Sequence, residues 1–280
     1  MTQPLSAAPL RQALPDLARW TGYFRQVEIP VLSATAESLE ELRANEDEVD
    51  ANMLGELIAT DPLMTLKVLA YAAAHRSSRL VTDAETVTAA LVLMGIPPFF
   101  RAFGPQPTVE SVLADRPDAL EGLERVLRRA DRSARFALGF AAHRMDPDAA
   151  VIYSAALLHD FAEMLLWVHA PDLALEILRR QRADSTLRSA EVQRAVLNIE
   201  LDDLEQSLMQ AWRLPELLAQ ITDDKHGNDA RVLSVRLAVR LARHSADGWG
   251  NAALPDDIRD ISRLMNLDLA ATERLLHEFD

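Results

Sequence analysis

The residues best placed to do chemistry are the adjacent pair His159-Asp160, which follows an apolar run within residues 155–163. Imidazole nitrogens and carboxylate oxygens are both ligands for divalent metal ions. Neighbouring residues of a helix are offset by about 100° around its axis, yet both side chains can reach a common ion at the axis of a helical bundle. The pair therefore predicts a metal site, a surface pair or a hydrogen-bonded pair in the core of a bundle.

A second polar group precedes this pair and consists of four arginines: Arg128, Arg129, Arg132 and Arg135. One of them can point inward and pair with Asp160, so that a guanidinium takes the place of a metal. Alternatively, all four form a solvated face that Glu121 and Glu124 balance. A third hypothesis is a phosphate-binding patch, because guanidinium groups bind phosphate through paired hydrogen bonds.

Helices must position both groups, because apolar residues recur along the chain with the helical period of 3.6. No convincing strand with a period of 2 occurs. The pattern predicts a long helix from about residue 119 to 144, which carries the arginines. Pro147 then begins a helix that continues to about residue 169 and carries His159-Asp160. With about a dozen helices and short connections, the predicted fold class is all-α.

Capping residues indicate where the other helices begin and end. Asp50 and the Asp61-Pro62 pair each predict a helix start, and Thr82 or Asp83 predicts the start of a helix over 87–94. Residues 99–107 contain one glycine and two prolines and are predicted to form a loop. Further helices are predicted at 35–43, 63–72, 171–178, 191–199, 204–212, 215–221, 229–244, 255–265 and 269–279.

Composition narrows the class of protein. The 280 residues are 49% hydrophobic and 26% charged, which is typical of a globular domain, and they include no cysteine. Disulfides and cysteine-ligated metal sites are thereby excluded. The formal net charge of -14 argues against general binding of nucleic acid or an anionic membrane. No uninterrupted signal-peptide core occurs, so we expect a cytoplasmic protein with neither nucleic acid nor membrane as partner.

Four sequence segments, taken in order, resemble the HDOD (HD-related output domain) branch of the HD superfamily, a family of bacterial signalling modules. Residues 58–69 combine a helix, an Asp-Pro break and a leucine-rich helix, and residues 87–95 read VTAALVLMG. Residues 156–160 carry the signature His-Asp pair, and residues 212–215 read Trp-Arg-Leu-Pro where the family has Trp-Gly-Leu-Pro. Together they cover roughly residues 31 to 224.

In catalytic HD phosphohydrolases, the resemblance implies a histidine on the preceding helix, the His-Asp pair and a later aspartate, which together hold a metal that activates water. This sequence departs from that pattern. No histidine lies near residues 130–135, and His143 is about 16 Å too far along a helix axis. Val239 occupies the place of the later acid. Asp131, Asp223 or Asp224 would have to complete the site.

Other marks of the enzymes are missing as well. The glycine-tyrosine-proline signature of the branch that hydrolyses cyclic-di-GMP is absent, and Glu163 stands near the place of the usual lysine. Two protein ligands do not hold a metal against water. Scattered surface positions are expected for five other histidines: His75, His169, His226, His244 and His277.

The predicted organisation is an N-terminal helical extension over 1–25, an HDOD-like domain over 26–225 and a C-terminal helical extension over 226–280. Within the domain, a helical subdomain up to about residue 117 packs on a degenerate HD-like bundle.

The resemblance implies a non-catalytic signal-transduction module, a pseudo-enzyme without cofactor, that binds a signalling partner protein or an anionic nucleotide. His159, Asp160 and the four arginines would mark the cleft. The alternative is a metal-dependent phosphohydrolase acting on nucleotides or cyclic dinucleotides.

Overall fold

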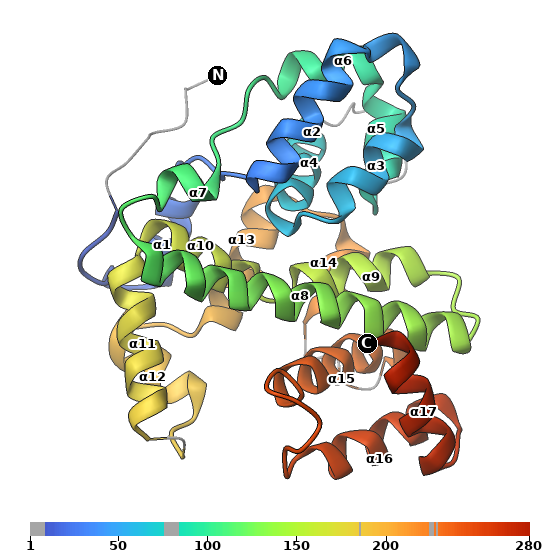
Figure 1. Cartoon of the computed structure of the whole chain (residues 1–280). Coiled ribbons are helices and arrows are strands. Elements are labelled where there is room, and N and C mark those ends of the chain that lie inside the picture. The colour runs from blue at the N-terminus through green and yellow to red at the C-terminus, as the bar shows by residue number, and fades with distance from the viewer. Residues whose placement is uncertain (1–8, 76–83, 185, 224–226, 228) are drawn as a thin grey trace. The chain divides into compact units, whose positions relative to one another are not determined.

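The fold is all-α, as the sequence predicts. The computed structural model describes residues 9–75, 84–184, 186–223, 227 and 229–280 (Figure 1). Within these ranges no strand is formed, and Val31 forms an isolated parallel bridge with Thr108. The chain divides into two compact units that are interleaved along the sequence.

The first unit comprises Met1–Val126 and Asp160–Leu214. Its helices are α1 (Leu17–Phe24), α2 (Ser33–Ala44), the 3-10 helix η1 (Glu46–Glu48), α3 (Ala51–Ala59), α4 (Pro62–Ala74), α5 (Val87–Met94), α6 (Ile96–Ala102), α7 (Val109–Val112), the start of α8 (Pro117–His143), α10 (Phe161–His169), α11 (Pro171–Ala183), α12 (Ser189–Leu197) and α13 (Leu201–Trp212).

The second unit comprises Leu127–His159 and Pro215–Asp280. It contains the remainder of α8, then α9 (Ala149–Leu158), α14 (Glu216–Thr222), α15 (Ala230–His244), α16 (Leu254–Met265) and α17 (Leu269–Phe279). α9 packs against α14 and α15, while α16 packs against both α15 and α17. The domain limits predicted from the sequence refer to consecutive segments and stay a prediction.

Two aspartates begin helices as predicted. The carboxylate of Asp50 accepts hydrogen bonds from the backbone N–H groups of Asn52 and Met53 at the start of α3. Asp61 is fully buried and accepts from Leu63 and Met64 at the start of α4, while its second oxygen accepts from the backbone of Leu32. Asp61 therefore joins the chain before α2 to the start of α4.

Two predictions about local structure are wrong. Thr86, rather than Thr82 or Asp83, caps α5, through a hydrogen bond from the backbone of Ala89 at 3.2 Å. Thr82 and Asp83 lie outside the described residues. Residues 99–107 are not a loop throughout, because their first part belongs to α6. The first turn of α6 contains Pro97 and Pro98. A first turn tolerates proline because its N–H groups have no partner within the helix.

One segment has the length and composition of a membrane-spanning helix. In the part of the chain that the structure describes, Ala149–His169 alone meets that test, with a mean hydropathy of 1.4 in its most apolar window. However, 67% of this window is buried inside the protein. A buried core helix passes the same test, so composition is weak evidence for a membrane span.

Substitution of Gly122 tests the packing of the first unit. A Cβ atom at this position on α8 would overlap the indole ring of Trp167 on α10, which is 3% exposed. Gly122→Ala is therefore expected to lower the free energy of unfolding by about 2 kcal/mol, as overpacking of a core does. Gly22→Ala is the matched control, because nothing lies within 4 Å of its Cβ position on α1. The control should gain up to about 1 kcal/mol, and equal urea midpoints for the two variants would contradict the prediction.

Candidate functional site

His159 and Asp160 lie at a break between two helices rather than within one continuous helix. His159 follows the last residue of α9 with φ −54° and ψ −34°, and Asp160 precedes α10 with φ −107° and ψ 22°. The flanking residues Leu158 and Phe161 are both fully buried, whereas the pair is half-buried. The predicted helix from Pro147 to residue 169 is therefore two helices, and the polar pair forms their joint.

The described residues bring no further metal ligands into a group with the pair. Within the described ranges, no group of three histidines, aspartates or glutamates is close enough to share one. Asp131 instead forms an ion pair with Arg135 at 3.0 Å, and His143 Nε2 lies 3.2 Å from the backbone oxygen of Met265. Asp223 follows the end of α14. Asp224, like His226, lies outside the described residues.

Two of the predicted arginines contact the end of α17. Arg132 Nε donates to Asp280 Oδ1 at 2.7 Å, and Arg132 also donates to the backbone oxygen of Ser245. Arg135 donates to the backbone oxygen of Asp280 at 2.9 Å. Burial raises the pKa of Asp280, but the hydrogen bond and charge of Arg132 outweigh it and hold that pKa below its usual value. These two arginines therefore anchor α17 to α8.

The other two arginines, Arg128 and Arg129, are exposed and half-buried, respectively, on α8. Glu121 accepts a hydrogen bond at 2.5 Å from Arg125, which is outside the group of four, so the solvated-face hypothesis stays a prediction. Pairing of an arginine with Asp160, and the phosphate-binding patch, both stay predictions.

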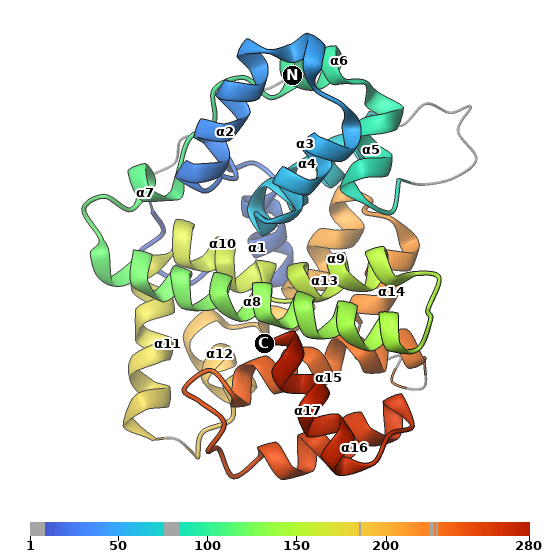
Figure 2. The same ribbon diagram turned by 45° about the vertical axis from the view of Figure 1, so that its right-hand side comes forward.

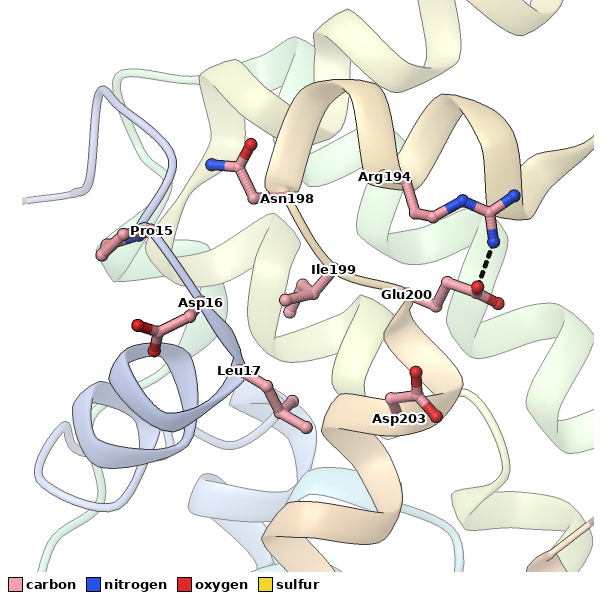
Figure 3. Close-up of a pocket in the computed structure, with 8 residues that line it drawn as sticks. All are labelled: Pro15, Asp16, Leu17, Arg194, Asn198, Ile199, Glu200 and Asp203. Carbon is pink, nitrogen blue, oxygen red and sulfur yellow. Dashed lines mark hydrogen bonds and ion pairs between the residues drawn. The ribbon is translucent and has the colours of Figure 1, made fainter.

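A pocket of about 300 Å³ that no sequence motif predicts lies in the first unit (Figure 3). Its lining residues come from the start of α1 and from the connection between α12 and α13: Pro15, Asp16, Leu17, Arg194, Asn198, Ile199, Glu200 and Asp203. Asp16 caps α1, and Arg194 pairs with Glu200. The two segments are far apart in the sequence, and neither carries a motif that would bring them together.

Histidine positions also differ from the expectation of scattered surface sites. His169, the last residue of α10, is 8% exposed, and its ring packs against the rings of Tyr23 and Phe24. Burial lowers the pKa of His169 to about 4, and a backbone hydrogen bond with Glu28 offsets part of that effect. His244 Nδ1 lies 2.6 Å from Oδ2 of the buried Asp257. The sequence does not predict the burial of His169, because a single histidine before Pro171 forms no periodic pattern.

Comparison with solved structures shows which proteins share the fold. The MmoQ response regulator from Methylococcus capsulatus is 21% identical, with a TM-score of 0.66 over 89% of this chain and 98% of that chain. A virulence factor from Campylobacter jejuni is 14% identical, with a TM-score of 0.59 over 91% and 93% of the two chains. At these identities the likeness shows the fold alone.

Comparison with curated proteins finds no match. The family model of the HDOD domain, in contrast, matches residues 29–227. That range contains the Asp61-Pro62 break, the His159-Asp160 pair and the Trp-Arg-Leu-Pro turn at residues 212–215. Because the match covers most of the sequence, the chain belongs to the HDOD domain family.

Proposed function

We propose that this protein is a non-catalytic signal-transduction module of HDOD type, which acts in the cytoplasm by binding a partner protein or an anionic small ligand. The region around His159 and Asp160 marks the binding cleft. Its mechanism is recognition, because the pair offers one imidazole and one carboxylate but no complete ligand set. Fold likeness to a protein named as a response regulator agrees with a signalling role.

The donor set around the pair carries this proposal. A catalytic HD site needs at least three protein ligands to hold its metal. No such group is found among the described residues, and Asp131, the candidate that the sequence offers on the preceding helix, is paired with Arg135. Asp131 would have to give up that ion pair before it could bind a cation.

Metal content of the purified chain tests the proposal. We expect elemental analysis to find no stoichiometric transition metal, and we expect the same melting temperature with chelator and with added Mn²⁺. A ligand that binds only the folded state raises the melting temperature, so a bound ion would be visible in this measurement. The variants His159→Ala and Asp160→Ala should show the same insensitivity to metal.

One metal ion per chain, lost together with thermal stability when chelator is added, would contradict the proposal. In that case hydrolysis of phosphate esters becomes the function to assay, first with nucleotides and then with cyclic dinucleotides.

A further inference from the structure

The first unit carries opposite charge on two separate surfaces. The acidic band lies within residues 37–50 on α2, η1 and the start of α3; it contains one arginine, Arg43, and seven acids: Glu37, Glu40, Glu41, Glu46, Asp47, Glu48 and Asp50. The basic tip lies where α11 leads into α12; it contains one acid, Asp184, and four arginines: Arg179, Arg180, Arg182 and Arg188. Both views of the structure place α2 and the α11–α12 connection at opposite ends of this unit (Figures 1 and 2).

The single base of the acidic band does little to neutralise it. The guanidinium of Arg43 donates to the backbone oxygens of Phe100, at 2.6 Å, and of Phe103, at 2.5 Å. Arg43 also forms an ion pair with Glu40 of the band at 3.2 Å. All the acids of the band except Glu46 are exposed, so most of their charge faces solvent.

The basic tip contains one acid, and two further acids, Glu176 and Glu191, flank it. The carboxylate of Asp184 accepts from the backbone N–H and the hydroxyl of Thr186. Arg179 and Arg180 share one carboxylate, that of Glu176, and their side chains are 66% and 45% exposed. Arg182 and Arg188 are also exposed, and Glu191 is an exposed acid in the first turn of α12. A hydrogen bond between Gln181 and Ser189 at 3.0 Å ties α11 to α12 beside these two arginines.

We propose that the basic tip binds the acidic band of a second copy of this chain. Because the two surfaces lie at opposite ends of one unit, an antiparallel pair forms both contacts at once and closes as a two-fold dimer, the commonest symmetric assembly. The net charge of -14 repels nucleic acid and a second copy alike, but only the second copy offers two complementary contacts that offset this repulsion. Guanidinium groups suit the carboxylates of the band, which they bind through paired hydrogen bonds.

Sedimentation velocity of the full chain tests the dimer. Contacts between exposed charges are screened strongly once the Debye length falls to a few Å. We expect dimers at about 50 mM salt and monomers at about 0.5 M salt. If the chain stays monomeric at low salt and at about 100 µM protein, the proposal is overturned. Even a weak but specific interface has a dissociation constant below about 100 µM.

Charge reversal identifies the two surfaces. The tip variant is Arg182→Glu with Arg188→Glu, and the band variant is Asp47→Arg with Glu48→Arg. We expect each to weaken self-association about tenfold or more. The matched control, Arg259→Glu with Arg263→Glu on α16, changes the net charge of the chain as the tip variant does, at sites 51% and 71% exposed. The control should dimerise like the wild type.

Mixing the two variants gives the decisive result. In a pair made of one tip variant and one band variant, both contacts again join opposite charges, so dimers should reappear. Circular dichroism before mixing confirms that each variant is folded. If the mixture stays monomeric, or if the control loses dimerisation as the tip variant does, the association does not occur through these two surfaces. Binding of a DNA duplex that the tip variant alone loses would likewise assign the tip to nucleic acid and overturn the proposal.

Discussion

Replacement of Trp20 by alanine is expected to lower the free energy of unfolding by about 4 kcal/mol, as is typical for removal of a buried aromatic ring. Trp20 on α1 is fully buried, and its indole N–H donates to the backbone oxygen of Leu197 at 2.9 Å. Its ring stacks on Phe24 with the centroids 5.8 Å apart. The variant loses both the apolar contacts and the partner of a buried carbonyl. Urea denaturation, followed by circular dichroism, gives the loss as a shift of the midpoint.

Trp20→Phe separates these two contributions. It keeps an aromatic ring next to Phe24 but leaves the oxygen of Leu197 without its donor, so we expect a loss of about 2 kcal/mol. If the alanine variant is no less stable than the phenylalanine variant, the ring of Trp20 does not join α1 to the end of α12.

The second large effect is a loss of stability in mild acid that depends on His169. In the unfolded chain this histidine binds a proton near pH 6.5, whereas burial lowers its pKa in the folded protein to about 4. The unfolded state therefore binds more protons between these values, and the free energy of unfolding falls as the pH falls through that window. The total loss from this group is about 3 kcal/mol.

Comparison of His169→Asn with wild type from pH 7 to pH 4 isolates this contribution, because the asparagine keeps a donor for the backbone of Glu28 but does not titrate. We expect a flatter pH dependence in the variant, while the exposed His75→Asn retains the slope of the wild type. Carboxylates such as Asp229, whose pKa Arg231 holds at about 2, lose their contribution at lower pH than this window. Parallel curves for wild type and His169→Asn would refute the prediction.

Helix class and most helix positions can be predicted from this sequence, because apolar spacing and capping residues act locally. The long amphipathic helix predicted from residue 119 to 144 is observed at Pro117–His143. In contrast, the break at His159-Asp160 has no local signal, since apolar residues continue on both sides of the pair. Periodicity reports which residues are apolar, and it does not report where a buried helix changes direction.

Site residues are harder to predict because their partners are distant in the sequence. The arginines of α8 could be recognised as a group, but the contact of Arg132 and Arg135 with Asp280 spans more than half of the chain. Burial of His169 likewise depends on Tyr23 and Phe24 of α1. The family resemblance singles out His159-Asp160, since it rests on whole patterns rather than on single positions, and the role of the pair stays a prediction.

Because the two units are interleaved along the sequence, the chain cannot be truncated at the limits of the family match without affecting a unit. The chain passes from one unit to the other within α8, between His159 and Asp160, and between Leu214 and Pro215, so the last two crossings fall in or beside family motifs. A fragment that ends at residue 227, where the family match ends, would lose α15 and expose the side of α9 that packs on it. Residues Ala149–Leu158 are mostly apolar and buried, so that side of α9 would become an exposed apolar patch that favours aggregation. We therefore expect a fragment limited to the residues that the family model matches to be less soluble than the full chain.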